Sequence, residues 1–181
     1  MKKQIFLIGY MGCGKSTLGI ALAKSLGWSF VDLDEAFEQQ QRCTITEYFK
    51  LHGEDGFRKA EHELLKTSLD IENRVYATGG GMPCFFDNMA LMNANGLTIY
   101  IKLPAPALCR RLAGGKHHRP LIANKSDDEL LEFIDIKLKE REPFYNQAKL
   151  IVEDSGTLSV QGYVNIIRSA KEMKTFDSLP A

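Results

Sequence analysis

The 181-residue chain has no excess of charge of either sign, because 23 Lys and Arg residues balance 23 Asp and Glu residues. Nucleic-acid-binding proteins and proteins of anionic membrane surfaces carry a basic excess, so we expect neither partner here. No apolar run approaches the ~20 residues of a membrane span. The first β-like run starts near residue 4, so we also expect no signal peptide and a cytoplasmic location.

Cysteine is scarce as well, and its four residues form no C-x-x-C pair. This spacing resembles neither a zinc site nor a disulfide framework. We expect free, mostly buried thiols at positions Cys13, Cys43, Cys84 and Cys109.

Internal repeats, low-complexity segments and dividing linkers are absent too, and the length suits one domain. We therefore expect a single domain over residues 1–174, followed by a disordered tail at 175–181. A neutral single domain without heptads gives no reason to expect more than a monomer.

Five apolar, β-rich runs alternate with stretches of helical periodicity. The runs are Gln4–Gly9, Ser29–Leu33, Arg74–Thr78, Leu97–Leu103 and Lys149–Val152. Strands that alternate with helices predict a parallel sheet with right-handed crossovers covering both of its faces. The fold class is therefore α/β.

Residues 9–16 read G-Y-M-G-C-G-K-S, a complete G-x-x-x-x-G-K-[ST] phosphate-binding loop. It follows an apolar run and precedes a helical pattern, which is the order that the motif requires. In such a loop the backbone amides surround the phosphates, Lys15 reaches the β and γ oxygens, and Ser16 ligates Mg²⁺. The helix that starts here adds a partial positive charge of about +0.5. We therefore predict a nucleoside triphosphate as ligand.

Asp32 and Asp34 follow at the end of the second predicted strand, where a period of two places both carboxylates on one side of the chain. One carboxylate can support Mg²⁺ while the other orients or deprotonates an attacking hydroxyl. The alternative is a structural role for Asp34 as the N-cap of the next helix.

Arg58 and Glu61 lie one helical turn apart, and alone they are typical of a solvated ion pair. Gly79, Gly80 and Gly81 follow the third strand, where glycines allow a ligand to approach the backbone. The alternative for them is a plain flexible turn.

Two more arginines complete the candidate set. Arg119 precedes a proline in a loop-like stretch, and a cation on a mobile loop can close over a γ-phosphate. Arg141 is either a ligand-binding cation or a residue that ends its helix by interacting with the helix dipole.

Taken together, these motifs closely resemble the shikimate kinase family nearly from end to end. The resemblance rests on the phosphate loop with Ser16-Thr17, Asp32-x-Asp34, Phe57-Arg58-x-x-Glu61, Gly79-Gly80-Gly81, Arg119-Pro120-Leu121 and Arg141-x-Pro143-x-Tyr145-x-x-Ala148.

The resemblance implies a three-layer P-loop fold, with a five-stranded parallel sheet of order 2-3-1-4-5 and a mobile lid at about residues 112–125. It also implies transfer of the γ-phosphoryl group of ATP to the 3-hydroxyl of shikimate, in the route to chorismate and the aromatic amino acids.

The same resemblance assigns the site residues. The catalytic residues are Asp34, Lys15 and Arg119. The residues expected to bind ATP are Gly12, Cys13, Gly14, Lys15, Ser16, Thr17, Arg111 and Arg119. The residues expected to bind shikimate are Asp34, Arg58, Gly79, Gly80, Gly81 and Arg141. Mg²⁺ is the expected cofactor, with Ser16 and Asp32 as its protein ligands.

Two rival functions stay open at this point. Another small-molecule kinase of the same fold, such as gluconate kinase, shares the phosphate loop but needs a different acceptor pocket. A catalytically silent relative would bind ATP and shikimate as a sensor. An assay of acceptor-dependent ADP release separates all three.

Overall fold

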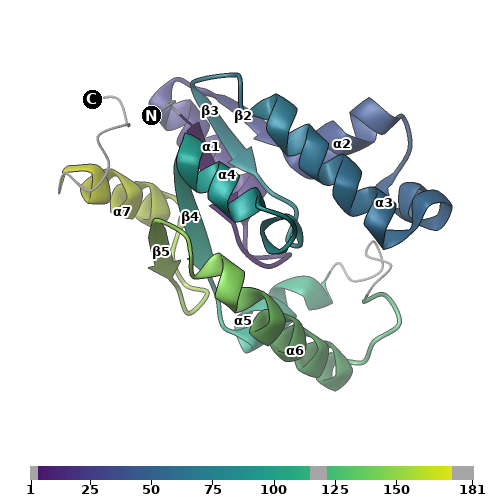
Figure 1. Cartoon of the computed structure of the whole chain (residues 1–181). Coiled ribbons are helices and arrows are strands. Elements are labelled where there is room, and N and C mark those ends of the chain that lie inside the picture. Colours follow the sequence, from purple (N-terminus) through teal and green to yellow (C-terminus); the bar gives the residue numbers. More distant parts are fainter. Residues whose placement is uncertain (1–3, 115–121, 173–181) are drawn as a thin grey trace.

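The computed structural model of the chain describes residues 4–114 and 122–172. Its centre is a five-stranded parallel sheet of order β2-β3-β1-β4-β5 (Figure 1). The strands are β1 (Gln4–Ile8), β2 (Ser29–Asp32), β3 (Arg74–Ala77), β4 (Leu97–Lys102) and β5 (Leu150–Glu153). The predicted α/β class and strand order are confirmed.

Seven α-helices and one short 3₁₀ helix connect these strands in the described ranges. They are α1 (Lys15–Leu26), α2 (Leu33–Gln41), α3 (Ile45–Ser68), η1 (Met82–Cys84), α4 (Asn88–Asn95), α5 (Ala105–Ala113), α6 (Asp127–Tyr145) and α7 (Val160–Glu172).

The central strand β1 shows why both sheet faces are covered. All five of its residues are buried, and its side chains alternate between two apolar clusters. Ile5 and Leu7 face the cluster formed with α1, α5, α6 and α7, whereas Phe6 and Ile8 face the cluster formed mainly with α2, α3 and α4. A central parallel strand thus reads as a continuous apolar run.

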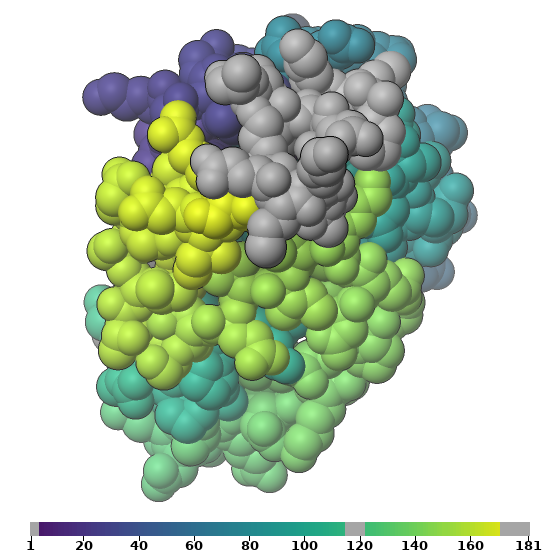
Figure 2. Space-filling model, turned by 90° about the vertical axis from the view of Figure 1, so that its left-hand side faces the viewer, coloured from purple at the N-terminus to yellow at the C-terminus, as the bar shows by residue number. Residues whose placement is uncertain are grey.

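The first cluster brings both ends of the described chain together. Helices α1 and α7 pack on each other, and the yellow surface of α7 adjoins the purple N-terminal surface in Figure 2. Helices α5 and α6 lie side by side below the sheet in Figure 1. No helix in the described ranges is long and apolar enough to cross a membrane.

Helix starts are set by short polar side chains. Thr44 with Glu47, and Ser126 with Glu129, form complete capping boxes at α3 and α6. Helix α1 differs, because its N-cap is Gly14, which offers no side-chain acceptor. The side-chain caps found at α3 and α6 are therefore missing at the first turn of α1, next to the phosphate loop.

The cysteines are free, as predicted, but the expectation that most are buried was wrong. Cys13 is buried, whereas Cys43, Cys84 and Cys109 are only partly buried. All four lie outside the strands, and the three partly buried ones are on helical or loop segments where solvent reaches part of the side chain.

Candidate active site

The phosphate loop connects β1 to α1 and owes its shape to glycine. Gly12 and Gly14 have φ angles of 79° and 102°, a region that other residues rarely adopt. A Cβ atom on Gly12 would also lie 2.8 Å from the Leu112 side chain. Glycine is therefore required both for the turn and for its packing against α5.

Lys15 is folded back over this loop. Its ammonium group donates hydrogen bonds to the carbonyl oxygens of Gly9 and Tyr10, at 2.9 and 3.1 Å. Cys13 is buried beneath, with its sulfur 3.8 Å from the same ammonium group. Ser16 and Thr17 are exposed in the first turn of α1. The loop therefore places one cation and a set of backbone amides at a single strand end.

Ser16 and Asp32 meet across the start of two helices. The Ser16 hydroxyl donates to Asp32 Oδ2 at 2.6 Å, and Asp32 Oδ1 accepts from the Asp34 amide at 3.0 Å. Asp32 is therefore the N-cap of α2, and the alternative that gave this role to Asp34 was wrong. Since β2 ends at Asp32, Asp34 lies in the first helical turn instead of on the strand.

Asp34 and Glu61 direct their carboxylates at one glycine. A Cβ atom on Gly79 would lie 2.6 Å from Asp34 Oδ1 and 2.9 Å from Glu61 Oε1. Surrounding protein and the charge of Asp32 raise the pKa of Asp34, although solvent still reaches its side chain. Burial raises the pKa of Glu61 from 4.5 to about 7, against the opposing charge of Arg58.

Arg58 is held beside the same glycine segment. Its Nη1 donates to Glu61 Oε2 at 2.8 Å, and its Nη2 lies 3.4 Å from Glu54 Oε1. A Cβ atom on Gly81 would lie 2.6 Å from Nη2. Since Glu61 is only 3% exposed, this pair is buried, and the alternative of a solvated surface pair was wrong.

Arg141 reaches the segment from α6. Its guanidinium lies 5.4 Å from the centre of the Tyr10 ring, and a Cβ atom on Gly80 would lie 3.3 Å from its Nη1. The Tyr145 hydroxyl donates to the Gly80 carbonyl. Helix α6 continues to Tyr145 and has no basic residue in its last turn, so the helix-ending alternative for Arg141 was wrong.

The three glycines thus each contact a different charged group. Gly79 lies against Asp34, Gly80 against Arg141 and Gly81 against Arg58. These close contacts are not those of a plain flexible turn. The structure brings together every described residue that the sequence assigned to the acceptor.

Arg111, on α5, contacts the phosphate loop and is not part of the cluster around Gly79–Gly81. It donates to the Cys13 carbonyl at 3.0 Å and to the Gly156 carbonyl at 3.4 Å, and its Nη2 lies 3.9 Å from Asp154 Oδ2. It therefore connects the phosphate loop to the turn between β5 and α7.

Asp154 organises that turn, and the sequence reading missed it. Its Oδ1 accepts from the amides of Gly156, Thr157 and Leu158, while its Oδ2 accepts from the Tyr163 hydroxyl at 2.8 Å. The available signal was the sequence Asp-Ser-Gly-Thr directly after a strand, which is typical of an Asx turn.

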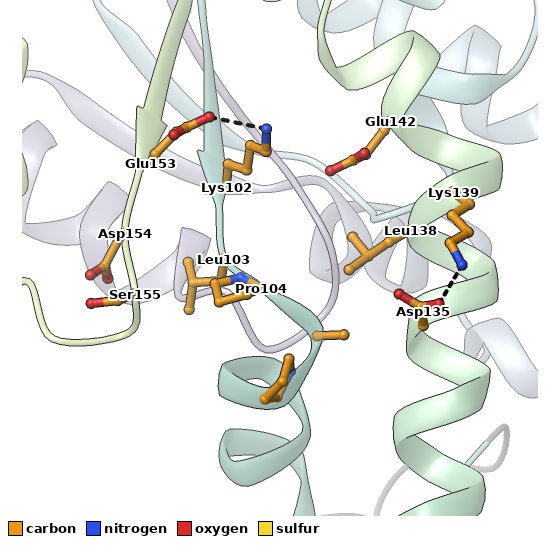
Figure 3. A pocket seen from close by; sticks show the side chains of 12 residues that line it. Lys102, Leu103, Pro104, Asp135, Leu138, Lys139, Glu142, Glu153, Asp154 and Ser155 are labelled. Atoms are coloured by element: carbon orange, nitrogen blue, oxygen red, sulfur yellow. Dashed lines mark hydrogen bonds and ion pairs between the residues drawn. The ribbon is translucent and has the colours of Figure 1, made fainter.

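A separate cavity of about 650 Å³ lies between the ends of β4 and β5, the start of α5, and α6 (Figure 3). Its cations are already paired, Lys102 with Glu153 at 3.0 Å and Lys139 with Asp135 at 2.6 Å. Its lining includes no residue of the phosphate loop. The converging charged groups described above, and not this cavity, form the candidate active site.

Arg119 lies outside the described residues, as does the central part of the predicted lid. The described site is therefore built from the strand ends of β1, β2 and β3 and from α1, α2, α3, α5 and α6. A phosphate loop after the central strand of a 2-3-1-4-5 parallel sheet, facing a cluster of carboxylates and arginines, defines a P-loop phosphotransferase.

Comparison with known proteins shows which family of P-loop phosphotransferases this chain resembles. The family model "Shikimate kinase" matches residues 11–171. The shikimate kinase of Phocaeicola vulgatus is 49% identical over 146 residues, which cover 81% of this chain and 83% of that protein.

Solved structures agree with this match. The crystal structure of shikimate kinase from Bacteroides thetaiotaomicron aligns with a TM-score of 0.90 and 40% identity, covering 95% of this chain and 99% of that one. The Acinetobacter baumannii shikimate kinase in complex with shikimate aligns with a TM-score of 0.81 and 28% identity, covering 96% and 94%. The chain belongs to the shikimate kinase family of ATP-dependent phosphotransferases.

Proposed function

We propose that this chain transfers the γ-phosphoryl group of ATP to the 3-hydroxyl of shikimate, giving shikimate 3-phosphate and ADP on the route to the aromatic amino acids. The observation that carries the proposal is the meeting of Asp34, Arg58 and Arg141 at the triple-glycine segment, beside the phosphate loop. A planar carboxylate with neighbouring hydroxyls suits this set, because arginine forks bind carboxylates and Asp34 accepts from hydroxyls.

On the nucleotide side, the phosphates receive hydrogen bonds from the phosphate loop and the first turn of α1. The residues are Gly12, Cys13 and Gly14, through their backbone amides, and Ser16 and Thr17, through amides and hydroxyls. Lys15 would leave the carbonyl oxygens of Gly9 and Tyr10 to contact the β and γ oxygens. Arg111 would lie along the adenine edge, a role supported by its contacts to both the loop and the β5–α7 turn.

The residues present fit a magnesium site. Hydroxyl and carboxylate oxygens are the ligands that Mg²⁺ prefers, and Ser16 Oγ lies 2.6 Å from Asp32 Oδ2. Ser16 and Asp32 would hold the ion, which would supply positive charge to the phosphates of ATP. Among the described residues no group of three or more His, Cys, Asp or Glu side chains forms a metal cage. A site completed by phosphates and water needs none.

The reaction then depends on positioning. Arg58 and Arg141 hold the carboxylate of shikimate, which orients its 3-hydroxyl toward Asp34 and the γ-phosphorus. The hydroxyl oxygen forms a bond to phosphorus, the bond to the bridging oxygen of ADP breaks, and Asp34 takes the hydroxyl proton. The raised pKa of Asp34 makes its carboxylate a better proton acceptor than an ordinary aspartate.

Arg119 completes the proposed catalytic set, as the cation that covers the transferring phosphate from a lid at about residues 112–125. We also propose that the chain works as a single-domain cytoplasmic monomer over residues 1–174. One sheet containing strands from residue 4 to residue 153 supports the single domain.

The direct test is ADP release by the purified protein with Mg²⁺ and ATP, in the presence and absence of shikimate. Gluconate and nucleoside monophosphates serve as control acceptors. We expect release that depends on shikimate alone. Release with gluconate instead would mean that the arginines were misassigned, and silence with every acceptor would support a sensor.

A further inference from the structure

The Arg58 guanidinium lies among three phenylalanine rings. Its Cζ is 4.2 Å from the ring centre of Phe85, 4.9 Å from that of Phe57 and 6.0 Å from that of Phe49. Phe57 precedes Arg58 directly on α3 and Phe49 lies before the kink of α3 at Gly53, whereas Phe85 follows η1. The nearest ring therefore comes from a different segment of the chain.

Hydrogen bonds alone fix this guanidinium poorly. Nη1 has a good acceptor in Glu61, but among the described residues Nη2 has only the long contact to Glu54, whose side chain is 58% exposed. Nε is buried and has no hydrogen-bond partner within the described ranges. The orientation of the guanidinium plane therefore depends on what packs against it.

Phe85 is well placed to provide that packing because its own segment is anchored. The buried Asn88 donates its side-chain amide to the Met82 carbonyl at 2.8 Å, and its backbone amide donates to the Phe85 carbonyl at 3.3 Å. Asn88 Oδ1 accepts from His62 Nδ1 at 2.7 Å. His62 is one turn from Arg58 on α3, so the two segments are tied together.

We propose that Phe85 is a positioning residue for acceptor binding. Its ring covers the Arg58 guanidinium by a cation–π contact and holds it against Gly81 in the orientation that receives the acceptor carboxylate. The proposal rests on the proposed function, in which Arg58 binds the carboxylate of shikimate. Phe85 acts through Arg58 and does not itself touch a reacting atom.

Four variants test the proposal. Phe85→Leu and Phe85→Met remove the ring face but keep an apolar side chain, and the second retains more length if the first folds poorly. Phe85→Tyr keeps the ring. Phe86→Leu is the matched control, because Phe86 is the next residue, is 58% exposed and packs on His62 instead of on a guanidinium.

The measurement is the Michaelis constant for shikimate and for ATP, with the unfolding midpoint of each unliganded variant. We expect Phe85→Leu and Phe85→Met to raise KM for shikimate about three- to tenfold, the range of a partly desolvated cation–π contact, and to leave KM for ATP unchanged. Phe85→Tyr and Phe86→Leu should match the wild type.

Equal effects of Phe85→Leu and Phe86→Leu would overturn the proposal, as would a parallel rise of both Michaelis constants or an unchanged KM for shikimate. The behaviour of the wild type distinguishes a failure of the proposed function from a failure of the role of Phe85. Absence of shikimate-dependent ADP release from the wild type defeats the proposed function itself, whereas normal wild-type turnover with unaffected variants defeats only the role of Phe85.

Discussion

The two halves of the site are built in different ways. The proposed phosphate half comes mostly from one contiguous segment, residues 9–17, which offers backbone amides, two hydroxyls and one lysine, and Arg111 joins it from α5. The acceptor half takes side chains from α2, α3 and α6 and sets them around the backbone of Gly79–Gly81. On the proposed function, the first half suits any nucleoside triphosphate, and the second would determine which acceptor is phosphorylated.

The two halves also differ in how deeply they bury charged and polar side chains. The acceptor half buries a carboxylate, Glu61, to hold Arg58, while the phosphate half keeps Ser16 and Thr17 exposed. Because taking a carboxylate and a guanidinium out of water can cost more than their mutual attraction returns, this buried pair contributes little to stability.

The largest effect is expected from Asp34→Asn. The amide cannot accept the hydroxyl proton, so kcat should fall by about 10²- to 10⁴-fold, while ATP affinity stays unchanged because Asp34 belongs to the acceptor half. Steady-state kinetics and calorimetric ATP titration measure the two quantities. Glu35→Gln, the neighbouring exposed position on α2, is the control. Retained turnover would remove Asp34 from the mechanism.

The next effect concerns stability and comes from Glu61. Its pKa of about 7 in the folded protein, against 4.5 ordinarily, means that the native state binds a proton more tightly than the unfolded chain between these values. The unfolding free energy should therefore fall as the pH rises through this window, by up to about 3 kcal/mol.

Urea denaturation at several pH values between 4.5 and 8 tests this assignment. We expect Glu61→Gln to show a flatter pH dependence than the wild type. Glu63→Gln, on the same helix with a 63% exposed side chain, should follow the wild type. Identical profiles for wild type and Glu61→Gln would show that this carboxylate is not the buried titrating group.

A smaller effect is expected from Gly81→Ala. The φ and ψ angles of Gly81 suit alanine, but the new Cβ would lie 2.6 Å from Arg58 Nη2 and displace it. Weakening one charge-assisted contact should raise KM for shikimate about tenfold and leave KM for ATP unchanged. Gly114→Ala is the control, since no atom of the described residues lies within 4 Å of its Cβ position. Equal behaviour of both variants would contradict the packing argument.

Much of the fold could be predicted from the sequence because its signals are local. The strand runs were placed to within a residue or so, and the phosphate loop was complete as a motif. The strand order came from the resemblance to the shikimate kinase family. Strand β2 ends one residue before the predicted boundary, because Asp32 caps α2 and Leu33 is already helical.

The rest of the site could not be predicted because it depends on tertiary contacts. The spacing of Arg58 and Glu61 is the same in a solvated pair and in a buried one, and only the packing of the glycine segment over them distinguishes the two. The role of Phe85 could not be predicted, because in the sequence a ring that covers a guanidinium is indistinguishable from any other apolar residue. Asp154 had a turn signature that was overlooked.

The most direct test of the two-part site is calorimetric titration of Lys15→Met and Arg58→Lys with ATP and with shikimate separately. Arg58→Lys keeps the charge beside Glu61 but loses the planar fork. We expect Lys15→Met to lose ATP affinity with shikimate binding retained, and Arg58→Lys to lose shikimate affinity with ATP binding retained. If either variant lost both ligands together, the two halves would not be independent and the account would be wrong.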